Sequence, residues 1–248
     1  MEHKKEKRNE RAAIQLGLFL VGLLLFGTAA GGQLTGEEKN GKEKAAIQTS
    51  GGVSDAAEPK KIALTFDDGP SSFTNRLLDC LEKNNAKATF FMTGTEIASF
   101  PDEVKRMKKL GCELGNHTYD HTELTTLSFD EISSEVDKVN EQLINLTGEG
   151  ASVVRPPYGS VNDTVKSAIN LDWKTLNAES TVEEVMNNVT DGSVILMHDI
   201  FSTSVDAAEI LIPQLIEKGY QLVTVHELAA LHQTELSAGV TYSEFGEK

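Results

Sequence analysis

Short runs of β-branched and other apolar residues alternate with amphipathic stretches along most of this chain. The β-like runs lie at residues 62–66, 88–92, 113–115, 153–154, 194–197 and 222–225. The amphipathic stretches lie at residues 77–81, 104–110, 132–146, 161–169 and 205–216. Repeated βα units of this kind predict an α/β domain with a mostly parallel sheet, either wound open or closed into a barrel.

The composition limits the classes of function. The chain has 23 Lys and Arg residues against 38 Asp and Glu residues, a formal net charge of −15. Such a surface repels phosphate backbones, which argues against a nucleic-acid-binding protein. The 2 cysteines, Cys80 and Cys112, are too few for a disulfide scaffold or a Cys-rich zinc module. We expect them to be buried free thiols, with a disulfide as the alternative.

The first 30 residues have the layout of a targeting segment. A basic stretch at residues 4–11 precedes an apolar run at residues 12–30. Both a cleavable signal peptide and an uncleaved membrane anchor have this layout. A buried helix of the domain is a third reading, against which the basic flank argues. We therefore expect the folded part outside the cytoplasm, either secreted or held in the cell envelope by an N-terminal transmembrane segment.

Composition divides the rest of the chain into three parts. Residues 31–58 are rich in Gly, Lys, Glu, Ser and Ala, which predicts a disordered linker. Residues 59–231 carry the alternating pattern and form the predicted domain. Residues 232–248 are polar with few apolar anchors, so we expect a loosely ordered C-terminal tail.

Polar residues follow directly after several of the β-like runs. In parallel α/β folds, chemistry collects at the carboxyl ends of the strands. The first run leads into Asp67 and Asp68, which are followed by Gly69 and Pro70. Two adjacent carboxylates belong either to a solvated turn or beside a cation that neutralises at least one of them.

The third run is followed by His117 and His121. A spacing of four places both imidazoles on one face of a helical turn. An Asp oxygen from the neighbouring first strand would complete a His, His, carboxylate set around a divalent metal. Two exposed surface histidines are the alternative. The set also suits Fe(II), and zinc is preferred only because hydrolysis fits the other residues.

Two further strand ends carry Arg155 and His198. Either residue alone could be structural, Arg155 as the partner of a core acid and His198 as a satisfied core histidine. Four marked strand ends together predict one site on one face of the sheet.

Five motifs in chain order resemble those of the metal-dependent polysaccharide deacetylases with a NodB-homology domain, carbohydrate esterase family 4. They are TFDDGP at 65–70, HTYDH at 117–121, RPPYG at 155–159, Asp172-Trp173 and LMH at 196–198. The resemblance covers about residues 60–231. It implies a distorted (β/α) barrel with fewer than eight regular units. The implied activity is hydrolysis of N- or O-linked acetyl groups on a sugar polymer.

The resemblance also implies a role for each site residue. Asp68, His117 and His121 would hold Zn²⁺ or another divalent transition metal such as Co²⁺. Asp67 would be the general base and His198 the general acid. Arg155 and Asp172 would support the base.

The same resemblance implies the contacts with the substrate. The backbone N–H of Tyr158 would stabilise the oxyanion. Trp173 and Leu196 would form the walls of a small pocket for the acetyl methyl group. The implied substrate-binding residues are Pro156, Tyr158, Trp173 and Leu196.

The chain departs from the family pattern between Gly159 and Asp172. Residues 161–169 already have a helical pattern, so only Asn170 and Leu171 remain where family members place a strand. We therefore predict a barrel short of one strand between Ile169 and Asp172. Either the segment after Pro157 supplies the strand, or the barrel opens there. Unpaired buried backbone groups would cost about 1 to 3 kcal/mol each. Asp172 and Trp173 are the site residues whose positions this departure affects.

These features lead to two hypotheses of different class. The first is a deacetylase of N-acetylglucosamine residues in a cell-surface polysaccharide, with peptidoglycan first and chitin oligomers or acetyl-xylan as alternatives. The second is a catalytically impaired module that binds glycan or zinc, for which the missing strand is the reason. The expected partners are the polysaccharide and, if the N-terminal segment is uncleaved, the membrane. We expect a monomer.

Overall fold

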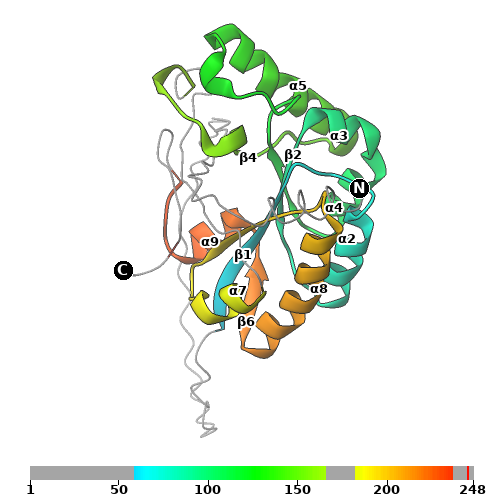
Figure 1. Ribbon diagram of the computed structural model, residues 1–248, viewed down its shortest axis with the longest axis vertical. Coiled ribbons are helices and arrows are strands. Elements are labelled where there is room, and N and C mark those ends of the chain that lie inside the picture. The colour runs from blue at the N-terminus through cyan, green and yellow to red at the C-terminus, as the bar shows by residue number, and fades with distance from the viewer. Residues whose placement is uncertain (1–58, 166–181, 237–244, 246–248) are drawn as a thin grey trace, which may run out of the picture. The chain divides into compact units, whose positions relative to one another are not determined.

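The computed structural model describes residues 59–165, 182–236 and 245 (Figure 1). Its six strands form one sheet, in which every pairing is parallel. They are β1 (Lys60–Asp67), β2 (Thr89–Met92), β3 (Glu113–Asn116), β4 (Val153–Val154), β5 (Val194–His198) and β6 (Tyr220–Val223). Each β-like run of the sequence overlaps one of these strands, which confirms the predicted parallel α/β class.

The strand order is β4-β3-β2-β1-β5, and β6 also pairs with β1. β6 pairs with the first half of β1 and β2 with the second half. Within the described residues the sheet is open between β4 and β5, and the segment that joins these two strands includes residues 166–181. The predicted loss of a strand between Ile169 and Asp172 lies outside the described residues and stays a prediction.

The helices are α2 (Thr74–Lys83), α3 (Gly94–Ser99), α4 (Pro101–Lys109), α5 (Phe129–Thr147), α7 (Val182–Asn188), α8 (Ser202–Glu217) and α9 (Val225–Leu231), with 3₁₀ turns η1 (Leu124–Thr126) and η2 (Pro157–Gly159). Four predicted amphipathic stretches are confirmed as helices. Of the fifth, residues 161–169, only residues 163–165 are described as helical. The pattern missed α9 because Val225 reads as a strand residue. Thr224 and Glu227 form a capping box that begins a helix there instead.

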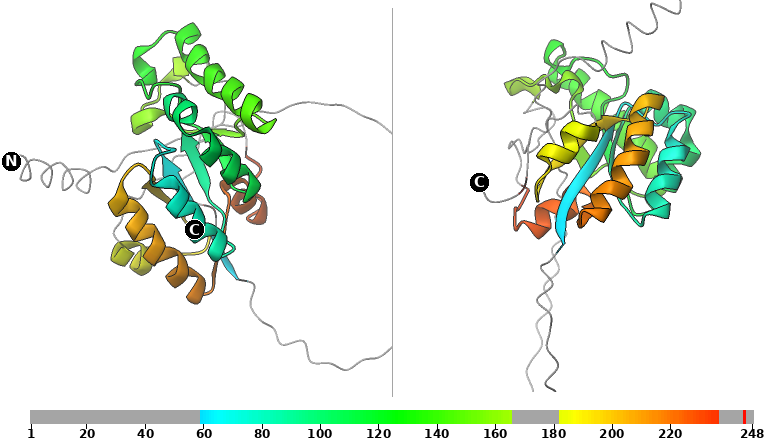
Figure 2. Two further views of the ribbon diagram at one scale, coloured as in Figure 1. Left: turned by 90° about the vertical axis from the view of Figure 1, so that its right-hand side faces the viewer. Right: turned by 60° about the horizontal axis from the view of Figure 1, so that its bottom comes forward.

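Both faces of the sheet are buried, as is usual for parallel sheets. On β1, Ile62, Leu64 and Phe66 pack into the larger core cluster with side chains of α2, α4 and α8. Ala63 points to the other face and packs against Val223 and α9. α2 and α8 lie side by side in all views (Figures 1 and 2). Because side chains alternate along a strand, Thr65 and Asp67 share the face of Ala63.

The second core cluster includes one residue of the C-terminal tail. Phe245 is 1% exposed, and its backbone N–H donates to the carbonyl of Gly192 over 2.8 Å. The expectation of a loosely ordered tail is therefore wrong at this position, because a single apolar anchor in a polar segment gives no pattern. Residues 237–244 and 246–248 lie outside the described residues.

Cys80 and Cys112 are free thiols, as expected; Cys112 is buried, but the expected burial of Cys80 is wrong, since it is only half-buried. Burial raises the pKa of the Cys112 thiol to about 11. No helix in the described part of the chain is long and apolar enough to cross a membrane. The predicted signal or anchor at residues 1–30 and the linker at 31–58 lie outside that part.

A buried polar cluster ties α9 to the amino ends of the strands. The Glu113 carboxylate accepts hydrogen bonds from Thr89 Oγ1 and Ser152 Oγ, each over 2.9 Å, and pairs with the His226 imidazole. Burial would raise the pKa of Glu113, but the pairing with His226 lowers it overall. Burial would lower the pKa of His226, but Glu113 raises it overall.

This pair predicts a pH-dependent contribution to stability. The contribution of His226 is fully present below the pKa of an unfolded histidine, about 6.5, and is lost as pH rises through its raised folded value. We expect His226→Gln to lower the free energy of unfolding by about 1 kcal/mol at pH 6, a Tm shift of about 2–4 °C, and by less at pH 9. Thermal unfolding of both proteins at the two pH values tests this. A loss equal at both pH values would contradict it.

Candidate active site

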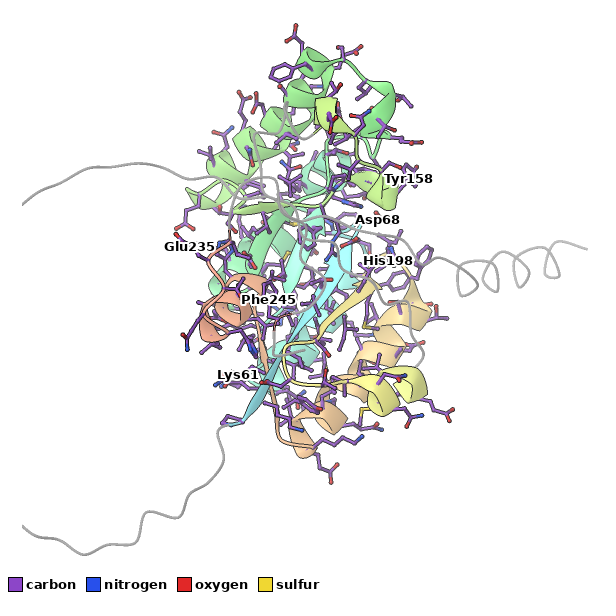
Figure 3. All side chains as sticks on the ribbon, turned by 90° about the vertical axis from the view of Figure 1, so that its left-hand side faces the viewer. Lys61, Asp68, Tyr158, His198, Glu235 and Phe245 are labelled. Atoms are coloured by element: carbon purple, nitrogen blue, oxygen red, sulfur yellow. The ribbon has the colours of Figure 1, made fainter. Side chains whose placement is uncertain are left out.

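Four strands deliver polar side chains to one end of the sheet. β1 ends at Asp67 and Asp68, β3 leads to His117, β4 leads to Arg155, and β5 ends at His198. Asp67 and His198 are direct partners in the pairing of β1 with β5. Figure 3 shows Asp68 between Tyr158 and His198, with Lys61 at the far end of β1. The predicted convergence of four strand ends is confirmed.

Asp68, His117 and His121 form the cluster that the sequence predicts. Their potential ligand atoms all lie within 4.8 Å of one another. Asp68 Oδ1 is 3.2 Å from Nε2 of His117 and 3.2 Å from Nε2 of His121. This oxygen is buried and has no hydrogen-bond partner among the described residues. An orphaned carboxylate oxygen facing two imidazole nitrogens fits a divalent cation with open positions.

A hydrogen bond on the side of the ring away from Asp68 orients the His117 imidazole. Its Nδ1 hydrogen-bonds with the backbone carbonyl of Arg155, so the ring N–H lies on that side and Nε2 faces Asp68. This arrangement is typical of metal-ligating histidines. Burial would lower the pKa of His117, but the carboxylates of Asp68 and Asp67 raise it overall. With an exposure of 3%, His117 is not a surface histidine.

The predicted helical turn around the two histidines is wrong. Residues 117–123 form a loop, in which Thr118 and His121 have φ values of 69° and 63°. Asn116 Oδ1 accepts the Thr118 N–H over 2.8 Å. The buried carboxylate of Glu135 accepts the N–H groups of the next two residues over 2.9 and 3.1 Å. These side chains replace helical hydrogen bonds, and the loop brings the imidazoles together.

Asp68 itself has a left-handed backbone, with φ at 71°. This conformation turns the chain at the end of β1. Asp67 therefore stays on the face of the sheet that holds Ala63 and Thr65, while Asp68 faces the imidazoles of His117 and His121. Burial would raise the pKa of Asp68, but His117 and His121 hold it well below its usual range. The carboxylate is therefore charged and available as a ligand.

Asp67 is paired with a buried arginine. Its Oδ1 accepts a hydrogen bond from Arg155 Nη1, which also donates to Thr65 Oγ1 over 3.0 Å. The guanidinium lies over the Phe91 ring, 3.9 Å from its centroid. The other oxygen, Asp67 Oδ2, is 4.0 Å from Nε2 of His117 and thus faces the Asp68, His117 and His121 cluster.

Two nitrogens of the Arg155 guanidinium make no hydrogen bond in the described residues. They are Nε and Nη2, and both are buried. Asp172 and Trp173 lie outside those residues, so their predicted places beside Arg155 and the acetyl group remain predictions.

His198 lies beside Asp68 Oδ2, whereas His117 and His121 face Asp68 Oδ1. Its Nε2 is 3.9 Å from Asp68 Oδ2, and its side chain is 24% exposed. Its backbone N–H donates to Ser204 Oγ over 3.2 Å. Leu196 pairs with Thr65 in the sheet and is 7% exposed, on the same face as His198.

Two exposed aromatic rings flank the site. Tyr158 is 55% exposed, and its ring contacts His121 edge-on with 4.8 Å between centroids. Its backbone has a φ of 59° within η2, and Pro156, two residues earlier, is buried. Phe201 is 44% exposed, and its ring lies edge-on to His198 at 6.1 Å. The sequence motifs missed Phe201, which only its place three residues after His198 could have suggested.

Comparisons with known proteins show the family of this chain. The family model described as polysaccharide deacetylase matches residues 54–175. A Bacillus cereus protein named peptidoglycan-N-acetylglucosamine deacetylase is 34% identical over 193 residues, which cover 68% of this chain and 71% of that protein. The chain belongs to the polysaccharide deacetylase family. The resemblance carried by the five motifs is thereby confirmed.

Other members of the family are longer. Peptidoglycan-N-acetylmuramic acid deacetylase PdaC of Bacillus subtilis is 42% identical over 180 residues, which cover 68% of this chain. The chain spans only 38% of the length of that relative.

A family 4 acetyl xylan esterase from Clostridium thermocellum, solved in complex with a cobalt ion, is a structural neighbour of this chain, with a TM-score of 0.68 and 31% identity. The match covers 75% of this chain and 98% of that one.

The cluster predicts one divalent metal ion per chain. We expect His121→Ala to weaken Zn²⁺ affinity by more than about 100-fold, because it removes one of three protein ligands. His226→Ala, which removes a histidine outside the cluster, is the matched control and should bind like the wild type. Competition titration with a chromophoric chelator measures all three proteins. Equal affinities for both variants would place the metal elsewhere.

Proposed function

We propose that this protein is a metal-dependent hydrolase that removes acetyl groups from N-acetylglucosamine residues of peptidoglycan. One observation carries the proposal: a carboxylate and an imidazole, Asp67 and His198, each approach the Asp68, His117 and His121 cluster to within 4.0 Å. A metal beside one group that accepts a proton and one that donates it suits hydrolysis of an acyl bond.

Asp68, His117 and His121 would hold the metal, with Zn²⁺ as the proposed ion and Co²⁺ as a substitute. When bound, a divalent metal supplies a Lewis acid for the acetyl carbonyl and for an attacking water. The cobalt complex of the related acetyl xylan esterase supports a divalent transition metal. The buried Asp68 Oδ1, which faces both imidazole nitrogens at 3.2 Å, supports the same assignment from this chain alone.

Asp67 is the proposed general base. Arg155 holds one carboxylate oxygen, which leaves Oδ2 directed at the cluster, where it can accept a proton from an attacking water. Because the Asp67–Arg155 pair is fully buried, the carboxylate has little freedom to rotate away from this direction. Asp172 is the proposed second partner of Arg155.

His198 is the proposed general acid, which protonates the leaving amine. It lies beside Asp68 and is partly exposed, as a group that meets a polymeric leaving group must be. The backbone N–H of Tyr158, in the turn η2 beside His121, is the proposed oxyanion donor. Leu196, with Trp173, is proposed to enclose the acetyl methyl group.

The proposed substrate rests on the relatives and on the rim of the site. Relatives that carry peptidoglycan deacetylase names match about two thirds of this chain. Tyr158 and Phe201 expose aromatic faces on two sides of the cluster, which suit the apolar faces of sugar rings. Chitin oligomers and acetyl-xylan are the alternative substrates. A bifunctional xylanase/deacetylase of Pseudobutyrivibrio xylanivorans is 40% identical over 184 residues.

We also propose that residues 1–30 direct the domain to the cell envelope, where this substrate lies. The basic stretch before the apolar run supports this. Cell fractionation of the full chain, beside a variant that starts at residue 31, would separate a secreted form from an anchored one.

Acetate release tests the proposed reaction. The zinc-loaded full chain is expected to release acetate from N-acetylglucosamine oligomers and from peptidoglycan. Asp67→Asn should lower kcat by about 10²- to 10⁴-fold and keep zinc bound, because it removes the base and not a ligand. Asp102→Asn, an exposed acid on α4, is the matched control and should keep full activity. A folded, zinc-bound wild type that releases no acetate would instead favour the impaired glycan-binding module.

Phe201 provides a second test, directed at the substrate. We expect Phe201→Ala to raise KM for oligomers about three- to tenfold with little change in kcat, because a stacking face is lost. Ile210→Ala removes a similarly exposed apolar side chain from α8 and should not change KM. Steady-state kinetics on oligomers of increasing length measure both. An unchanged KM in Phe201→Ala would remove this ring from the binding surface.

A further inference from the structure

Asp199 is a buried acid that the proposed reaction does not use. It follows His198 and is 0% exposed. Its Oδ2 accepts a hydrogen bond from Thr74 Oγ1, and its backbone carbonyl accepts one from Ser71 Oγ over 2.6 Å. Its Oδ1 is buried without a hydrogen-bond partner in the part of the chain that the structure describes. Burying a carboxyl group with an unpaired oxygen is unfavourable, so the position of Asp199 needs an explanation.

The turn after β1 is built around this carboxylate. A Cβ added to Gly69 would lie only 2.1 Å from Asp199 Oδ1 and 2.5 Å from Oδ2. Gly69 does not have a positive φ, so it is required for space and not for its backbone conformation. The turn also folds back on itself, since the Ser71 N–H donates to Thr74 Oγ1 over 2.7 Å. Gly69 and Thr74 therefore pack against the Asp199 side chain, and Ser71 holds its backbone carbonyl.

The same turn carries the metal-ligating carboxylate. A left-handed φ is uncommon at residues other than glycine, and surrounding contacts must hold the backbone there. The Asp68 N–H donates to the carbonyl of Phe91 over 3.1 Å, and the Gly69 carbonyl accepts from the Thr93 N–H over 3.1 Å. These bonds fix the turn to β2. The contacts of Asp199 fix it on the side of β5.

We propose that Asp199 is a positioning residue for the metal centre. Its buried carboxyl group holds the turn 69–74 against the end of β5 and so keeps Asp68 in the left-handed conformation that directs Oδ1 at the two imidazoles. Because Asp199 is also the neighbour of His198 in the chain, one side chain fixes the ligand on β1 relative to the imidazole on β5. The inference rests on the proposed function only in that the cluster binds a metal.

The burial of Asp199 makes Asp199→Asn the conservative variant to test. Loss of hydration, together with the nearby Asp68 and Asp67, raises the pKa of Asp199 to about 7, although the bond from Thr74 acts in the opposite direction. An uncharged group of the same shape should therefore serve in this place. Asparagine retains an oxygen for the Thr74 hydroxyl and fills the same volume, whereas alanine leaves the turn without its support.

The test compares Asp199→Ala with Asp199→Asn in the full chain. We expect Asp199→Ala to weaken Zn²⁺ affinity about 10- to 100-fold and to change the visible absorption spectrum of the Co²⁺ protein, because Asp68 is no longer held in place. Asp199→Asn should stay within about threefold of the wild type and keep its spectrum. All titrations are made below the Tm of the metal-free proteins, so that only folded protein is compared.

A purely structural role gives a different result. It would lower the Tm of metal-free Asp199→Ala and leave the Zn²⁺ affinity and the Co²⁺ spectrum unchanged, which would overturn the proposal. If Asp199→Ala does not fold, Thr74→Val removes the hydroxyl donor and leaves the carboxyl group in place. An affinity loss of at least about threefold is then expected, and an unchanged affinity overturns the proposal.

Gly69→Ala tests the same contact from the turn. The added methyl group would displace Asp199, so the variant should lose metal affinity as Asp199→Ala does. The double variant should be no worse than Asp199→Ala alone, because the methyl group then has space. Additive losses would contradict this. The readout is metal binding, so a wild type that binds zinc but releases no acetate contradicts only the proposed deacetylase.

Discussion

Two adjacent carboxylates at the end of a buried strand are the interaction around which this site is built. Taking an anion out of water costs several kcal/mol unless a partner compensates for it. Arg155 compensates Asp67, and the imidazoles of His117 and His121 face Asp68. The partners come from β3 and β4, so the sheet must hold its register for either acid to be tolerated. Stability and chemistry thus depend on the same contacts.

The backbone at the end of β1 separates the two acids by role. Strand alternation places Asp67 on the same face of the sheet as Thr65, where a hydrogen bond from Arg155 restrains its Oδ1. The left-handed turn at Asp68 breaks the alternation and directs its oxygen toward the imidazoles. A regular strand would have sent Asp68 to the opposite face, into the apolar layer that holds Phe66. The strained turn is therefore what allows adjacent residues to serve one centre.

Much of this arrangement could be predicted from the sequence, because it depends on local patterns. Apolar runs predicted each strand that the structure describes, and polar residues at their ends predicted the site of Asp68, His117 and His198. The patterns failed where a distant contact decides the local structure. The His117–His121 loop is shaped by the carboxylate of Glu135 from α5, and no spacing rule contains that contact. Asp199 likewise has no local signature, since its partners lie more than a hundred residues earlier.

The described part of the site contains all three proposed metal ligands and both proposed proton-transfer groups. These groups come from the ends of β1, β3 and β5, all of which lie in the described part of the sheet. We therefore expect a strand missing between Ile169 and Asp172 to act on other groups. It would act on Arg155, whose Nε and Nη2 have no partner in the described residues, and on the wall of the acetyl pocket. The consequence we expect is a less restrained base and a more open acyl site, with the Asp68, His117 and His121 cluster left intact.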